Sequence, residues 1–149
     1  MRKSSLAAGL TLAVAAALAI GCGEKGDPVR AALDRMVKAA HDRDASAVMS
    51  LLTSDFQAAD GSGRAESEEL LRRYFAAYEI LNVTLKDVEI ERAENAARVR
   101  FRADMSGQPL KVGGLSGLLP SSASYDFDLR MTRDGKTWKV AWASWTPVS

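Results

Sequence analysis

The sequence is poor in residues that build disulfide frameworks or metal sites. It has one cysteine and one histidine in 149 residues, which excludes an internal disulfide and leaves no Cys/His metal cluster. Neither sign of charge is in excess: the formal net charge of +1 gives no support for nucleic-acid binding. The chain is 47% hydrophobic and 26% charged, which is typical of a globular protein, and its length indicates one domain.

The N-terminus has the pattern of an export signal. Arg2 and Lys3 precede an uncharged run of 15 residues, 6–20. This run is shorter than the roughly 20 residues that span a bilayer, and it lacks the polar face of an ordinary core helix. We therefore interpret residues 1–21 as a signal peptide rather than a buried helix.

The run ends in Ala19-Ile20-Gly21-Cys22, which resembles the signal of bacterial lipoproteins, although that signal usually has Leu where Ala19 stands. The resemblance implies lipidation of Cys22 and a location in the bacterial envelope, on the outer membrane if the source is Gram-negative. Ordinary cleavage nearby, leaving a free thiol, is the alternative. Residues 22–26 would form a short tether. Residues 1–21 carry two cations and no acid, so the remaining 128 residues have a net charge of −1.

The next part of the chain predicts three helices. Asp27-Pro28 is a strong helix start, and apolar residues recur at helical spacing to about residue 43. Asp44 is predicted to cap a second, short helix, and residues 56–60 to form a short strand. Ser67 is predicted to cap a third helix.

From residue 81 the apolar period changes from 3.6 to 2. Alternating residues predict strands near 81–90, 97–105, 125–132 and 138–142, with a phase slip that indicates a bulge near Lys86-Asp87. Asp134-Gly135 predicts a hairpin. Helices followed by such a meander give an α+β fold: three N-terminal helices packed on a curved antiparallel sheet.

The polar face of that sheet carries arginines and aspartates. Arg98, Arg100 and Arg102 lie on one strand, and Asp126 and Asp128 on another. We expect cross-strand ion pairs, with an anionic-ligand site as the alternative. Ala141, Ala143 and Trp145 lie on the phase opposite Trp138, which would permit a homodimer contact.

One segment is longer than a simple hairpin needs. Residues 106–124 hold five leucine or valine residues among glycines and Pro120. The glycines at 113, 114 and 117 match no nucleotide-binding fingerprint, and we expect no cofactor. Loops of this length are functional or disordered. We interpret this one as a cavity lid or a partner contact, with packing on the sheet as the alternative.

Residues 29–145 resemble the nuclear transport factor 2-like superfamily, the cystatin-like α+β cone fold. The segments that carry the resemblance are 36–44 (MVKAAHDRD), 51–56 (LLTSDF) and 134–140 (DGKTWKV). The resemblance implies a domain over residues 27–149, with a curved sheet wrapped around the helices and a cone-shaped cavity. The family includes ketosteroid isomerases, dehydratases, cyclases and non-enzymatic modules, so the fold does not decide the function.

The isomerase chemistry needs a carboxylate base and two oxyanion donors. By resemblance the base position falls on Asp60, which also reads as a turn residue before Gly61. The donor positions fall on Met36 and near Phe127, neither of which can donate. The family's dehydratases use paired histidines, whereas this chain has only His41, which is expected to be solvated near the end of the first helix.

The sequence therefore favours a non-enzymatic envelope module that binds a small apolar ligand or an envelope protein. A pocket enzyme that uses Asp60 with a nearby Tyr is the alternative. The candidate pocket residues, each of which could equally be plain core, are Met36, Tyr74, Tyr78, Phe127 and Trp142.

Overall fold

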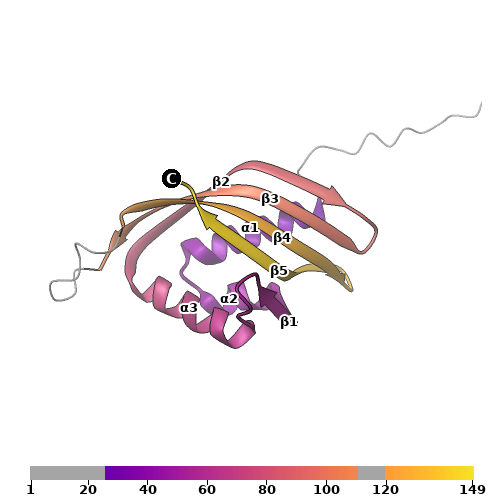
Figure 1. The fold of residues 1–149 in the computed structure, drawn as a ribbon, viewed down its shortest axis with the longest axis horizontal. Helices are drawn as coiled ribbons and strands as arrows, with labels where there is room; N and C mark the ends of the chain where they lie inside the picture. Colours follow the sequence, from indigo (N-terminus) through magenta and orange to yellow (C-terminus); the bar gives the residue numbers. More distant parts are fainter. Residues whose placement is uncertain (1–25, 111–119) are drawn as a thin grey trace, which may run out of the picture.

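The computed structural model describes residues 26–110 and 120–149. The proposed signal peptide (1–21), Cys22 and most of the tether lie outside the described residues. Within them the chain forms three helices and five strands (Figure 1). In chain order these are α1 (Pro28–His41), α2 (Ala45–Ser50), β1 (Leu52–Ala58), α3 (Arg64–Ala76), β2 (Tyr78–Arg92), β3 (Ala96–Pro109), β4 (Ser122–Asp134) and β5 (Thr137–Pro147). None of the described helices is long and apolar enough to cross a membrane.

Two of the three predicted helix starts are confirmed. The Asp27 carboxylate accepts a hydrogen bond from the Val29 amide at 2.8 Å, with Pro28 in the first helical turn. The Asp44 carboxylate accepts from the Ala47 amide at 2.9 Å. In each case the side chain satisfies an amide that has no partner within the helix.

The predicted start of the third helix is wrong. The N-cap of α3 is Gly63, whose amide donates to the Glu66 carboxylate at 3.1 Å, so the cap lies four residues before Ser67, where we expected it. Ser67 lies in the second turn of α3 and is buried. Its hydroxyl is therefore a core feature rather than a cap.

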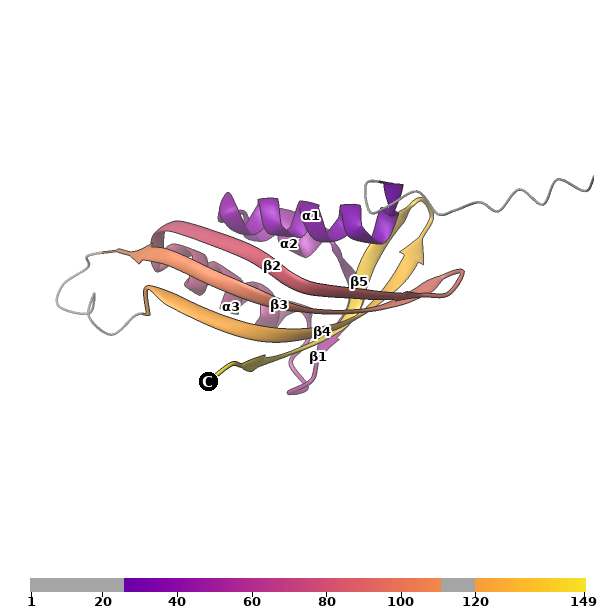
Figure 2. The same ribbon diagram turned by 90° about the horizontal axis from the view of Figure 1, so that it is seen from above.

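The sheet has the strand order β1-β5-β4-β3-β2. Strands β2 to β5 form the predicted antiparallel meander, whereas β1 pairs in parallel with β5, which corrects the all-antiparallel expectation. Figure 1 shows the curved sheet arching over α2 and α3, and Figure 2 shows α1 running alongside β2. The core lies between the helices and this concave face.

Register shifts in the sheet set which residues face the core, and two of them bear on the predicted strands. The predicted bulge in β2 is confirmed: the register shifts between Lys86 and Glu89, and Asp87 has φ +52°. A second bulge lies in β5, where Met131 pairs with Val140 but Arg130 pairs with Trp142. Because Ala141 is the extra residue, the strand changes phase after it.

This second bulge corrects the predicted faces of β5. Trp138 and Val140 are buried in the core, as expected from their alternation. After Ala141 the core-facing residues are Ala143 and Trp145, which we had placed on the outer face as a dimer contact. Trp142 lies outside, with the guanidinium carbon of Arg130 4.6 Å from its ring centroid.

The convex face carries the predicted cross-strand pairs. Arg98 bridges to Asp128 at 2.7 Å and Arg102 to Asp126 at 2.9 Å, while Arg100 bridges to Glu89 on β2 at 2.9 Å. The three arginines thus already have carboxylate partners, which disfavours the anionic-ligand alternative. Such exposed pairs contribute little to stability, because water screens them.

The predicted long segment 106–124 is partly strand. β3 continues to Pro109 and β4 begins at Ser122, and residues 111–119 lie outside the described part of the chain. Near its ends, the Leu110 amide donates to the Ala77 carbonyl at 2.9 Å, and the Tyr78 hydroxyl donates to the Pro120 carbonyl at 2.8 Å. The expectation of a lid or partner contact stays a prediction.

Candidate functional site

A cavity of about 370 Å³ lies between the helices and the concave face of the sheet. All three helices and all five strands contribute to its wall. Of its 24 lining residues, only Ser67, Tyr74, Tyr125 and Trp145 carry a side-chain nitrogen or oxygen. The site is therefore almost wholly apolar, as small-molecule pockets with a few orienting polar groups are.

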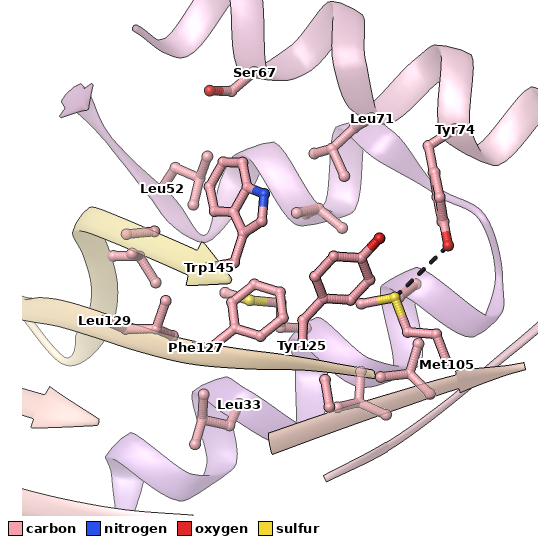
Figure 3. A pocket seen from close by; sticks show the side chains of 18 of the residues that line it. Leu33, Leu52, Ser67, Leu71, Tyr74, Met105, Tyr125, Phe127, Leu129 and Trp145 are labelled. Atoms are coloured by element: carbon pink, nitrogen blue, oxygen red, sulfur yellow. Dashed lines mark hydrogen bonds between the residues drawn. The ribbon is translucent and has the colours of Figure 1, made fainter. Parts of the chain in front are cut away.

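Helix α3 forms one wall of the cavity through a stripe of side chains at helical spacing. Ser67, Leu70, Leu71, Tyr74 and Phe75 follow the i, i+3, i+4, i+7, i+8 pattern and all line the cavity. Ser67 and Tyr74 are two turns apart, or roughly 10 Å along the helix. One buried hydroxyl thus lies near the start of the stripe and a phenol lies toward its end (Figure 3).

Aromatic rings from three strands form the opposite wall. The rings of Phe101 and Phe127 stack with centroids 5.1 Å apart, and the Trp145 indole lies 6.3 Å from Phe127. Tyr125 meets Phe127 edge-on at 6.4 Å. These contacts hold flat apolar surfaces toward the cavity (Figure 3).

The end of β5 contributes to the cavity wall where β1 no longer covers it. Strand β1 covers β5 only up to the pair Ala58 and Ala143, so among the described strands the segment 144–147 has a neighbour on one side only. Leu70 on α3 lines the cavity and is 55% exposed, and Trp145 is half-buried. The cavity wall therefore reaches the surface at Leu70, and Trp145 lines it from the end of β5 that β1 does not cover.

Three of the five predicted pocket residues line the cavity: Met36, Tyr74 and Phe127. The other two do not, and the structure corrects them. Tyr78 is 2% exposed and packs beside Tyr74 with its hydroxyl on the Pro120 carbonyl, so it supports the wall from behind. Trp142 is turned to the outer face by the Ala141 bulge.

Sequence reasoning missed Ser67, Tyr125 and Trp145 as pocket residues. Ser67 stands in register with Leu70, Leu71 and Tyr74, a spacing visible in the sequence. Tyr125 shares the phase of Phe127, which also was visible. Trp145 gave no such signal, because its inward position depends on the bulge.

Two polar groups of the cavity have unusual surroundings. The Tyr74 hydroxyl contacts the Met105 sulfur at 3.7 Å, and burial raises the pKa of Tyr74 to about 12. It therefore stays an uncharged phenol at physiological pH. The Ser67 Oγ is buried and has no hydrogen-bond partner among the described residues.

The candidate catalytic residue lies outside this cavity. The exposed Asp60 carboxylate accepts hydrogen bonds from the Ser62 hydroxyl and from the Ser62 amide at 2.9 Å. These hydrogen bonds, the one from the hydroxyl first, lower the pKa of Asp60 from its ordinary value. Asp60 is therefore the turn residue, and it is absent from the cavity wall.

His41 is also outside the cavity. His41 is exposed at the end of α1, and its Nε2 lies 3.3 Å from the carbonyl oxygen of Val83 on β2. Within residues 26–110 and 120–149, no group of three or more His, Cys, Asp or Glu side chains is placed to hold a metal.

Comparison with known proteins gives the fold. No family model matches the chain, and no curated protein matches it by sequence. Solved structures do. A candidate dehydratase of the NTF2-like family from Streptomyces avermitilis superposes with a TM-score of 0.69 at 17% identity, over 82% of this chain and 95% of that one.

The chain has the NTF2-like fold. A candidate scytalone dehydratase from Novosphingobium aromaticivorans gives a TM-score of 0.71 at 12% identity, over 82% of this chain and 83% of that one. Bd1075 of Bdellovibrio bacteriovorus gives 0.67 at 13% identity over 80% of this chain, which spans only 40% of the Bd1075 chain. At these identities the NTF2-like fold is shared, and the function is not transferred.

Proposed function

We propose that this protein binds a small apolar molecule in the cone cavity without catalysing a reaction. The observation that carries the proposal is the chemistry of the wall: among its 24 described lining residues there is no Asp, Glu, His, Lys, Arg or Cys. The wall does hold three hydroxyls, those of Ser67, Tyr74 and Tyr125, but a hydroxyl needs a neighbouring base or a lowered pKa to act as a nucleophile, and no such base is among the described lining residues. Apolar surface and shape suffice for binding.

The size of the cavity bounds the ligand. One water molecule occupies roughly 30 Å³ in the liquid. If each non-hydrogen atom of the ligand takes about the same volume, the 370 Å³ cavity holds about a dozen such atoms. A bicyclic aromatic or a medium-length hydrocarbon chain has this size.

A dehydratase is the second candidate, because two of the solved structures with this fold are candidate dehydratases. Against it, Asp60 and His41 are exposed and neither lines the cavity. The remaining titratable groups in the wall are Tyr74 and Tyr125, and the raised pKa of Tyr74 makes that phenol a poor base at neutral pH.

We further propose that a lipid on Cys22 holds the domain at the surface of an envelope membrane. The tether before the Asp27 cap is four residues, which extended spans on the order of 15 Å at about 3.5 Å per residue. The cavity would then collect its ligand close to the membrane. The near-neutral charge of the processed chain supports anchoring by acyl chains rather than by electrostatic attraction.

The test is native mass spectrometry of the purified protein. We expect a co-purifying apolar molecule of about a dozen non-hydrogen atoms or more. Leu71→Trp fills the cavity from α3 and should release it, whereas Ile80→Trp adds the same ring at an exposed position outside the wall and should retain it. A protein that carries no such molecule and binds none added, or a Leu71→Trp variant that retains it, would refute the proposal.

A further inference from the structure

Among the described residues that line the cavity, one deeply buried polar atom, the Ser67 Oγ, has no hydrogen-bond partner. Among the described residues, two buried side-chain oxygens lack a hydrogen-bond partner, Thr53 Oγ1 and Ser67 Oγ, and of these residues only Ser67 lines the cavity. Ser67 is 9% exposed and lies on the side of α3 that lines the cavity. Its amide bonds the Gly63 carbonyl at 3.1 Å, whereas its hydroxyl bonds no carbonyl of the preceding turn, the partner a helical serine usually takes.

An unpaired buried hydroxyl is costly, and native structures rarely keep one without a reason. Ser67 lies beside Leu70 and Leu71 in the stripe of α3, where alanine would remove the unpaired hydroxyl and favour the helix more. A ligand atom that pairs with the hydroxyl would remove the cost. The position of the serine, inside the cavity wall, is where such an atom would arrive.

The wall also restricts the charge of that atom. Among the described residues no charged side chain lines the cavity, so an ionised ligand group would lack a counter-ion there, at a far larger cost than a neutral polar group. A serine hydroxyl both donates and accepts, so it can pair with an alcohol or a carbonyl oxygen. It is uncharged and cannot compensate a carboxylate or an ammonium group.

We infer that the cavity selects a neutral hydrocarbon bearing one hydrogen-bonding oxygen, an alcohol or a carbonyl, and that Ser67 anchors this oxygen. The inference rests on the proposed function, because it names the ligand class of the same site. The aromatic wall of Phe101, Phe127 and Trp145 then packs against the hydrocarbon part. Discrimination between neutral and ionised ligands comes from the absence of charge in the wall, and discrimination between an oxygenated ligand and a bare hydrocarbon comes from Ser67.

The test uses four probes of one ring system sized to the cavity: naphthalene, 2-naphthol, 2-naphthoate and 2-naphthylmethylammonium. Their dissociation constants are measured by calorimetry at pH 7 with the purified protein. We expect naphthalene and 2-naphthol to bind, and both ionised probes to bind at least tenfold more weakly than 2-naphthol.

Ser67→Ala should raise the ratio of the 2-naphthol to the naphthalene dissociation constant about tenfold, because the naphthol oxygen loses its partner while the ring contacts remain. Thr53→Val is the matched control, since it removes the other unpaired hydroxyl outside the cavity wall and should leave the ratio unchanged.

The outcomes separate the two proposals. If naphthalene and 2-naphthol bind but Ser67→Ala leaves their ratio unchanged, or if an ionised probe binds most tightly, the inference is wrong and the apolar-binding function stands. If none of the four probes binds, both are wrong.

Discussion

Asp27, Asp44 and Ser67 are all residue types that commonly cap helices, but only the two aspartates do so in this chain. Asp27 and Asp44 were predictable as helix caps, because each stands just before an apolar periodic run. Ser67 was read by the same rule and is a buried wall residue instead. The N-cap of α3 is Gly63 instead, and its amide donates a hydrogen bond to the Glu66 carboxylate. The apolar register of Ser67 with Leu70 and Leu71 was the stronger signal.

The first prediction concerns how much the unpaired Ser67 hydroxyl lowers the free energy of unfolding of the ligand-free protein. Ser67→Ala should raise the free energy of unfolding by about 1 kcal/mol, because it removes an unpaired buried hydroxyl and improves helix propensity. Urea denaturation measures this change. Ser54→Ala, at an exposed position of β1, should stay within about 0.5 kcal/mol of the parent. A loss of stability in Ser67→Ala would mean that the hydroxyl is already paired.

At the scale of elements, the two bulges show where periodicity works as a predictor. In β2 the apolar phase visibly slips near Lys86, so the bulge could be located from the sequence. In β5 both phases are apolar: Trp138, Val140 and Trp142 on one, Ala141, Ala143 and Trp145 on the other. No alternation of polarity marks the change of phase there. The inward tryptophan therefore required the paired register of β4.

The second prediction uses that difference between the two tryptophans. 1-Decanol absorbs no near-ultraviolet light, so the tryptophan emission is seen alone. Its binding should shift the emission to shorter wavelength as the ligand displaces water from around Trp145. Trp142→Phe should keep the shift, and Trp145→Phe should abolish it. The reverse pattern would place the ligand on the outer face of β5.

The third prediction concerns the ion pairs of the convex face. The Arg102 guanidinium lowers the pKa of Asp126, and that of Arg98 lowers the pKa of Asp128, from the ordinary value of 3.8. A carboxylate whose pKa is lower in the folded than in the unfolded protein makes its full contribution to stability above the unfolded-state pKa. It loses this contribution as the pH falls through the lower folded-state pKa.

Unfolding free energies should therefore be flat from about pH 7 to 5 and should fall below about pH 4. Asp126→Asn should make the fall shallower, since one group that takes up a proton on unfolding is gone. Urea titrations at stepped pH values measure this slope. A stability that rises on acidification would contradict the assignment of the pairs.

At the scale of the whole molecule, the fold class could be predicted and the family resemblance implied a cavity, but the complete wall of that cavity could not be predicted. Helical and alternating periods specify three helices and a meander, and they suffice for the α+β class. The parallel pairing of β1 with β5 was not predictable, because no tight turn links β1 to its partner. That pairing ends at Ala143, and Trp145 lines the cavity from the part of β5 beyond it. The residues that line the cavity are therefore set by pairing between strands far apart in the sequence, which local patterns do not reveal.

The fourth prediction concerns the anchor. Cys22→Ser should prevent lipidation, and the chain should then fractionate as a soluble or unprocessed protein rather than one that needs detergent. Membrane fractionation with mass spectrometry of the N-terminal peptide decides this. A Cys22→Ser variant that is still processed and still needs detergent would show that another feature holds the protein at the membrane.

The central claim is that a small apolar molecule binds inside the cone, and the methionines test it most directly. Met36 and Met105 line the cavity, whereas Met49 and Met131 are buried outside its wall. With ¹³C-labelled methionine methyl groups, a carbon–proton NMR titration with naphthalene reports on both pairs at once. The account predicts saturable shifts of the Met36 and Met105 resonances, with those of Met49 and Met131 nearly unchanged. A titration in which naphthalene leaves the Met36 and Met105 resonances unshifted would contradict this claim.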